Sequence, residues 1–282
     1  MTTFGERLEE RVRARGVGAC VGIDPFADRV AGVRPGMSAP EVAAAIRAFG
    51  LAVVEAVAPL VPVVKPQVAL FERWGAPGVA ALTDVVRAAR ERGLVVIIDG
   101  KRGDIGSTAE AYAAAQLDED GPLGADAATV SPYLGPESLE PYLRRREAGK
   151  GMFVLVRTSN PGAAEWQLDT GIAERVAEWI AQTAPERGYG SVGAVVGATL
   201  PPAEVARWRA AMPRTWWLVP GFGAQGAGPQ EVRPHFDSDG LGALVSSSRE
   251  VGFPRGGADR DPVAEIGARA RAFVEAVRSA TR

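Results

Sequence analysis

The stretch LVVIIDGKRGDI, residues 94–105, is an apolar run that ends abruptly in charged side chains. An apolar run of this length is typical of a strand that is buried on both faces. Side chains alternate along a strand, so Asp99 and Lys101 are expected to share one face. Burying a lysine with aspartates is costly unless the charges pair with each other or with a ligand. The stretch therefore predicts a strand that carries a candidate site at its C-terminal end.

Lysine is rare in this chain, which makes the one in this stretch more informative. The sequence has 32 Lys and Arg residues, and the only lysines are Lys65, Lys101 and Lys150. Arginine keeps its proton in proteins, whereas a lysine can donate one. Lys101 and Lys65 are therefore candidates for a role that a guanidinium cannot fill.

Seven further apolar runs alternate with helical patterns from one end of the chain to the other. The eight predicted strands span residues 19–24, 61–66, 94–99, 127–131, 152–157, 193–198, 216–219 and 243–247. The predicted helices span residues 40–58, 77–92, 107–116, 136–146, 170–183, 201–211 and 261–279. A glycine-rich loop is expected at residues 221–228.

Eight strands separated by helices predict an α/β fold, a (β/α)8 TIM barrel, in a chain of typical length for one. No composition break divides the sequence, so residues 1–282 are expected to form a single domain with an amphipathic N-terminal helix within residues 1–15. The main alternative is a doubly wound open sheet. The segment after the first strand, Gly22-Ile23-Asp24-Pro25, lacks the Gly-x-Gly-x-x-Gly pattern that such a sheet often carries there.

Composition narrows the possible partners. A net charge of -2 and a pI near 5.7 give no general attraction to nucleic acid or to anionic membranes. The sequence begins without a signal peptide and contains no apolar stretch of about 20 residues, so a cytoplasmic protein is expected. Cys20 lies in an apolar run and is interpreted as a buried core thiol. His235, the only histidine, lies in a polar segment and is expected on the surface; no metal site is predicted.

Polar side chains follow every predicted strand. In a (β/α)8 barrel the C-terminal ends of the strands form the active-site face. Helix capping could explain one such residue, but it hardly explains a set at all eight strand ends. The set comprises Asp24, Lys65, Gln67, Asp99, Lys101, Ser131, Thr158, Asn160, Thr199, Gln225 and Arg249.

These motifs resemble those of orotidine 5'-phosphate decarboxylases. The family's Asp-x-Lys-x-x-Asp-Ile signature, with a threonine three positions later, is matched by Asp99, Lys101, Asp104, Ile105 and Thr108. Further matching segments follow the other strands, and the longer bacterial branch of the family is the most similar. They are GIDP at 22–25, VKPQ at 64–67, SPYLG at 131–135, TSNPG at 158–162 and PGFGAQG at 220–226. The chain departs from the family at Gly100, where alanine is common, and at Ser248, where glycine is common.

The resemblance implies removal of the C6 carboxylate of orotidine 5'-phosphate to give UMP and CO2, the last step of UMP biosynthesis, with no cofactor. Lys101 would donate a proton to C6, and Asp99 and Asp104 would lie beside the substrate carboxylate. The resemblance also implies roles in substrate binding. Lys65 would contact the ribose and support Asp99, and Asp24 would contact a ribose hydroxyl. Ser131 would contact the pyrimidine, and Gln225 and Arg249 would contact the phosphate.

The resemblance also implies a homodimer with shared active sites. In the family, the second aspartate of the signature reaches the neighbouring subunit together with the isoleucine and threonine that follow it. Asp104, Ile105 and Thr108 occupy those positions here. Each site would then need residues from two chains.

Two other functions compete with this one. A sugar-phosphate decarboxylase or an aldolase-like relative shares the strand-three motif on the same barrel and often needs Mg²⁺. The segments around Ser131 and Gln225 argue against it. A catalytically silent phosphate-binding barrel is the third possibility, and retention of Asp99, Lys101 and Asp104 argues against that one.

Overall fold

Eight parallel strands close into a barrel in the computed structural model, which describes residues 2–253 and 261–281. The barrel closes because β1 pairs with both β2 and β8. The predicted (β/α)8 barrel is therefore confirmed, and an open doubly wound sheet is excluded. The strands are β1 (Ala19–Ile23), β2 (Val63–Pro66), β3 (Val95–Arg102), β4 (Ala127–Val130), β5 (Gly151–Arg157), β6 (Val192–Val196), β7 (Trp217–Pro220) and β8 (Ala243–Ser247).

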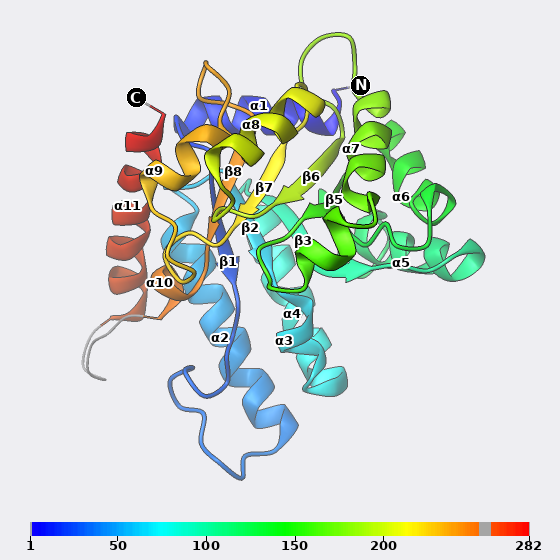
Figure 1. Ribbon diagram of the computed structural model, residues 1–282. Coiled ribbons are helices and arrows are strands. Elements are labelled where there is room, and N and C mark those ends of the chain that lie inside the picture. Colours follow the sequence, from blue (N-terminus) through cyan, green and yellow to red (C-terminus); the bar gives the residue numbers. More distant parts are fainter. Residues whose placement is uncertain (1, 254–260, 282) are drawn as a thin grey trace.

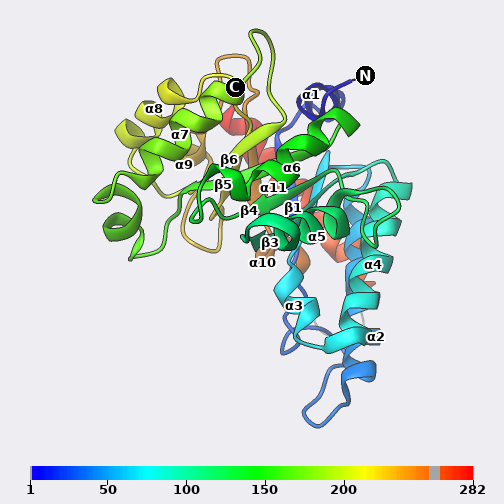
Figure 2. The same ribbon diagram turned by 90° about the vertical axis from the view of Figure 1, so that its right-hand side faces the viewer.

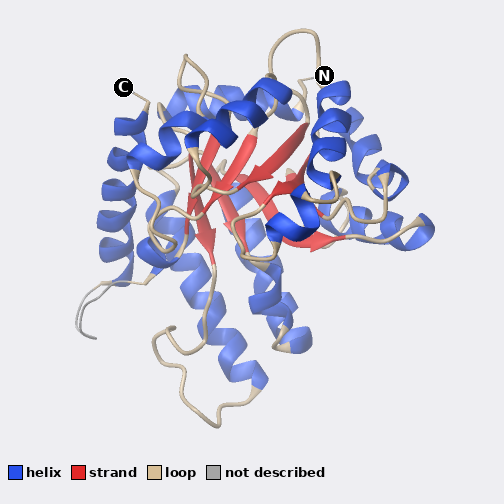
Figure 3. Ribbon diagram, in the orientation of Figure 1, coloured by secondary structure: helices blue, strands red, loops and turns tan. Residues whose placement is uncertain are grey.

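Helices surround the barrel on its outside, as Figure 3 shows by colour. They are α2 (Ala39–Val57), α3 (Val68–Glu72), α4 (Gly75–Glu91), α5 (Gly106–Leu117), α6 (Glu140–Arg144), α7 (Ile172–Thr183), α8 (Pro202–Ala211), α9 (Pro229–Val232), α10 (Arg249–Gly252) and α11 (Pro262–Ala280). The loop before α2 and the α3–α4 pair extend past the C-terminal ends of the strands (Figures 1 and 2).

Local sequence sets the helix boundaries. The side chain of Asp261 accepts a hydrogen bond of 3.0 Å from the backbone N–H of Val263, which caps the start of α11. The helix predicted at 136–146 is instead three short pieces: a 3-10 turn (Pro136–Ser138), α6, and a second 3-10 turn (Arg145–Ala148). Pro136 and Pro141 each lie in the first turn of one piece, the place where proline fits a helix, since it would break an interior.

The N-terminal helix α1 (Phe4–Arg15) covers the N-terminal end of the barrel, opposite the strand ends that carry the polar residues (Figure 1). Its buried side chains Phe4, Leu8 and Val12 join the cluster that fills the barrel interior. Phe4 packs edge-on against Phe153 with ring centroids 6.1 Å apart. This helix closes the barrel at one end and leaves the other end for chemistry.

His235 is buried, so its predicted surface position was wrong. Residues 229–235 form two short helical turns, and the ring packs edge-on against Trp217 with its Nε2 3.0 Å from the carbonyl oxygen of Gly197. Burial lowers the pKa of His235 to about 4, so the ring is neutral at physiological pH. The polar neighbours of His235 in the sequence suggested an exposed side chain, but tertiary packing places its ring in the core.

Cys20 is buried in β1 as predicted, and burial raises the pKa of its thiol to about 12. A thiol in this state does not act as a nucleophile.

Within the described part of the chain, no helix is long and apolar enough to cross a membrane.

Candidate active site

The backbone of β3 takes an unusual conformation where the signature begins. The strand runs to Arg102, three residues beyond its predicted end. Lys101 has φ +47°, and among the described residues it is the only non-glycine residue with a positive φ. Its N–H donates a hydrogen bond of 3.1 Å to Thr129 Oγ1 on β4. Left-handed backbone at a non-glycine residue is strained, and such strain collects at functional sites.

Asp99 is the centre of a hydrogen-bonded charge cluster. Its Oδ1 accepts from Lys101 Nζ at 2.5 Å and from Thr129 Oγ1 at 3.0 Å. Its Oδ2 accepts from Lys65 Nζ and from Gln67 Nε2, the latter at 3.1 Å. Two ammonium groups, a hydroxyl and an amide thus surround one carboxylate, which fixes its orientation. Asp99 and Lys101 lie on the same side of the strand, as the sequence predicted.

Charge pairing keeps this cluster ionised. Burial alone would raise the pKa of Asp99, but the ammonium groups of Lys65 and Lys101 hold that pKa well below its usual range. Burial alone would lower the pKa of Lys65, but the carboxylates of Asp99 and Asp24 raise it above the ordinary value. At neutral pH Asp99 is therefore a carboxylate and Lys65 an ammonium.

Lys101 and Asp24 each have a polar group available to a ligand. The side chain of Lys101 is 44% exposed although its Nζ contacts Asp99, whereas that of Lys65 is only 8% exposed. Asp24 Oδ1 is buried and has no hydrogen-bond partner within residues 2–253 and 261–281. A buried acceptor without a donor is costly, so a donor from a ligand would relieve it.

Asp104, Ile105 and Thr108 do not join this cluster within one chain. Asp104 Oδ1 accepts from the N–H of Ile105 at 2.8 Å, and Asp104 forms no ion pair with any described residue. The side chain of Ile105 is 56% exposed, and Thr108 is exposed as well. At the start of α5, Ile105 and Thr108 are thus exposed and Asp104 is half-buried.

Ser131 lies where β4 ends, beside the signature. Its N–H donates to the carbonyl oxygen of Arg102 at 2.8 Å, which ties the end of β4 to the end of β3. Gly103 packs closely over Ser131, because a Cβ at Gly103 would lie 3.2 Å from the Ser131 Cβ. Ser131 is therefore a neighbour of the Lys101 backbone at the barrel mouth.

Gln225 and Arg249 follow β7 and β8, which pair side by side in the barrel. Gln225 Oε1 accepts from Ser159 Oγ at 2.8 Å, and Arg249 begins α10 and is exposed. Ala224 and Arg249 line one cavity together with Arg29, Arg269 and Glu250. Its three guanidinium groups outnumber the one carboxylate, which favours an anion.

Sequence reasoning missed one polar residue of the site, Thr129, and named two others, Thr158 and Asn160. Thr129 was missed, because a threonine within an apolar strand is indistinguishable from a core residue until its hydroxyl is seen to bond Asp99. Thr158 and Asn160 bond each other at 2.5 Å, and Gln167 donates to Thr158 at 2.7 Å, so they organise the segment after β5. Thr199 is exposed after β6.

No group of three or more His, Cys, Asp or Glu side chains in the described ranges is arranged to hold a metal ion. The charged groups that converge at the mouth are the carboxylate of Asp99 and the ammonium groups of Lys65 and Lys101 that donate to it. Such a cluster is suited to anions and to proton transfer.

Comparison with known proteins decides the family. Residues 20–251 match the model of the Orotidine 5'-phosphate decarboxylase / HUMPS family. The chain belongs to this family. The match runs from β1 into α10 and contains every site residue that the sequence predicted.

Individual relatives agree with the family match. The chain is 45% identical over 272 residues to the orotidine 5'-phosphate decarboxylase of Rhodopirellula baltica, covering 90% of this chain and 89% of that protein. It is 45% identical over 260 residues to the enzyme of that name from Deinococcus radiodurans, covering 90% of each. A crystallised relative from Streptomyces avermitilis superimposes with a TM-score of 0.86 at 41% identity, covering 100% of this chain and 96% of the other.

Proposed function

We propose that this family member decarboxylates orotidine 5'-phosphate to UMP and CO2, with Lys101 as the proton donor. The observation that carries the proposal is the charge cluster at the barrel mouth, in which Lys101 Nζ lies 2.5 Å from Asp99 Oδ1. Relatives that are 45% identical bear the name of this activity. The enzyme is thus a carboxy-lyase that acts in pyrimidine biosynthesis.

The reaction needs a positive charge and a proton at one carbon atom. As the bond between C6 and the carboxylate breaks, its electron pair stays on C6, which has no adjacent carbonyl to accept it. The ammonium of Lys101 stabilises this charge and then transfers its proton from Nζ to C6. Asp99 holds the ammonium in position, and Lys65 and Thr129 hold Asp99 in turn.

The remaining site residues would bind the parts of the substrate that do not react. The unpartnered oxygen of Asp24 would accept from a ribose hydroxyl, and Lys65 would contact the ribose from beside Asp99. Ser131 would bond the pyrimidine amide edge. Gln225 and Arg249 would hold the phosphate, whose binding energy would position C6 against Lys101.

We also propose a homodimer in which Asp104, Ile105 and Thr108 complete the partner's site. Large apolar side chains gather at the ends of β3, β4 and β5, where Ile105 is 56% exposed, Tyr133 is 66% exposed and Trp166 is 58% exposed. Exposed apolar side chains gathered in this way mark interaction surfaces.

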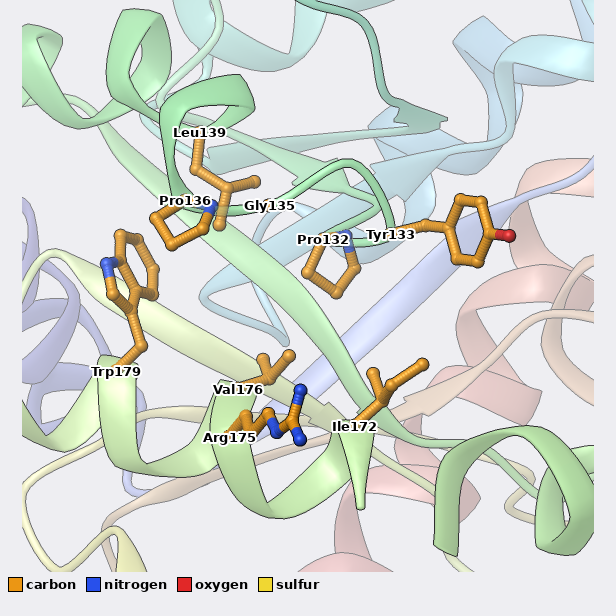
Figure 4. A pocket seen from close by; sticks show the side chains of 9 residues that line it. All are labelled: Pro132, Tyr133, Gly135, Pro136, Leu139, Ile172, Arg175, Val176 and Trp179. Atoms are coloured by element: carbon orange, nitrogen blue, oxygen red, sulfur yellow. The ribbon is translucent and has the colours of Figure 1, made fainter. Parts of the chain in front are cut away.

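A pocket beside Tyr133 extends this apolar surface. Figure 4 shows Pro132, Pro136 and Leu139 on one side of this pocket and Ile172 and Val176 of α7 on the other. The pocket encloses about 230 Å³. A second copy of the chain would bury both the pocket and the exposed side chains next to it.

Mixing two inactive variants tests the shared site. A shared site would take Lys101 from one chain and Asp104 from the other. Lys101→Ala and Asp104→Ala each remove one of these two residues. In a mixed dimer one of the two sites regains both residues, so an equal mixture should recover about a quarter of wild-type activity. No recovery, in a mixture shown to exchange subunits, would place Asp104 in the site of its own chain.

An ultraviolet assay with orotidine 5'-phosphate tests the activity itself. Conversion should proceed equally with and without a chelator. Turnover of a pentulose or hexulose phosphate that the chelator abolishes would favour the sugar-phosphate decarboxylase or aldolase-like alternative instead.

A further inference from the structure

A basic cleft lies at the end of the barrel opposite the active-site mouth. It encloses about 460 Å³ between α1, the C-terminal part of α4 and the start of β3. Its charged lining consists of Arg7, Arg11, Arg87, Arg90, Glu91 and Asp126. Four guanidinium groups thus face two carboxylates, in a chain whose overall net charge is -2.

Two of the arginines are anchored to the protein. Arg7 bonds Asp126 Oδ1 at 3.0 Å and the carbonyl oxygen of Gly149 at 2.7 Å. Arg90 pairs with Glu119 from beyond the cleft. These bonds hold both guanidinium groups at fixed places in the wall.

The other two arginines retain charge for a ligand. Arg11 is exposed and forms no ion pair with any residue in 2–253 or 261–281. Arg87 pairs only with Asp84, and that carboxylate is already shared with Arg47. Packing does not explain Arg11 either, because α1 is held by its opposite, apolar face.

The spacing of the four arginines along α1 and α4 places them around the same cleft. Arg7 and Arg11 lie four residues apart on α1, and Arg87 and Arg90 lie three apart on α4, so each pair shares one helix face. The planar guanidinium fork matches the oxygens of phosphate groups. The cleft volume lies in the range of small-molecule sites.

We propose that this cleft binds a phosphate-bearing small molecule with two or more negative charges, at a site separate from the barrel mouth. The ligand would lie between α1 and α4, with Arg7 and Arg90 as fixed walls and Arg11 and Arg87 as the groups whose charge it neutralises. The site does not depend on the chemistry proposed for Lys101.

Calorimetric titration with inorganic pyrophosphate at low ionic strength tests the site, since salt screens exposed charges. The titration is made on the full chain carrying Arg249→Ala, which removes the phosphate contact proposed at the mouth. Arg11→Gln and Arg87→Gln are added singly and together, and Arg146→Gln, another exposed arginine outside the cleft, is the matched control.

The account predicts that pyrophosphate binds the Arg249→Ala protein and that each cleft substitution weakens binding roughly tenfold or more, the usual cost of losing a charge-assisted hydrogen bond. Arg146→Gln should leave the affinity unchanged. Unaltered binding in the double cleft variant, or absence of binding in the Arg249→Ala protein, would overturn the proposal. Thermal unfolding without the anion checks that each variant is folded.

Discussion

Replacing Asp99 with asparagine should lower the free energy of unfolding of the protein, because it removes the central charge of the cluster and keeps its shape. The substitution removes the negative charge between Lys65 and Lys101 and keeps the side-chain volume. The side chains of Asp99 and Lys65 are only 6% and 8% exposed, so the Lys65 ammonium would be left buried without its partner. Breaking a buried ion pair on one side costs about 3–5 kcal/mol of unfolding free energy.

Urea unfolding at pH 7 measures this loss, and Asp84→Asn is the matched control. Asp84 also holds two cations, Arg47 and Arg87, but its side chain is 28% exposed. Exposed pairs contribute about 0–1 kcal/mol, so the control should lose little stability. An Asp99→Asn loss below about 1 kcal/mol, equal to that of the control, would refute the description of the cluster as a buried, mutually dependent set.

Two pKa shifts set the pH dependence of the stability that Asp99 and Lys65 give the wild type. The lowered pKa of Asp99 gives stability that is fully present above its unfolded pKa of about 3.9 and is lost as pH falls toward the folded value. The raised pKa of Lys65 gives stability that is fully present below about pH 10.4 and is lost as pH rises through the folded value. The stability that both groups give the wild type should therefore be flat from about pH 5 to pH 9.

Three other variants test neighbouring features. Thr129→Val should cost about 1–3 kcal/mol in urea unfolding, because Asp99 and the Lys101 N–H lose a buried partner. His235→Gln should have a lower free energy of unfolding than wild type above about pH 6.5, and this difference should disappear as pH falls toward 4. The reason is that the neutral buried ring stabilises the fold only above that range. An unchanged difference at pH 4 would contradict the lowered pKa. Arg249→Ala should lower kcat/KM roughly tenfold to a hundredfold through a lost phosphate contact, and equal kinetics would remove Arg249 from the site.

Strand alternation and barrel geometry made much of the fold and the cluster predictable. The apolar run at 94–98 predicts a buried strand, and alternation places Asp99 and Lys101 on one side of it. The same argument at the second strand places Lys65 at the mouth, where it meets Asp99. These relations are local, or they follow from the closed barrel, so they need no knowledge of side-chain packing.

The features that sequence reasoning missed depend on tertiary contacts. β3 runs past its predicted end and includes a left-handed backbone at Lys101, a conformation that lysine does not favour. His235 lies among polar residues, yet its ring packs against Trp217 in the core. Thr129 looks like an ordinary strand residue until the neighbouring strand brings Asp99 beside it.

The most direct test is the rate of orotidine 5'-phosphate decarboxylation by Lys101→Ala, measured by ultraviolet absorbance in the presence of a chelator. The side chain of Lys101 is 44% exposed, so the variant should remain folded with a melting temperature close to that of wild type. Loss of the proton donor and its charge should lower kcat by at least about a thousandfold. A folded Lys101→Ala protein with near-normal turnover would contradict the account.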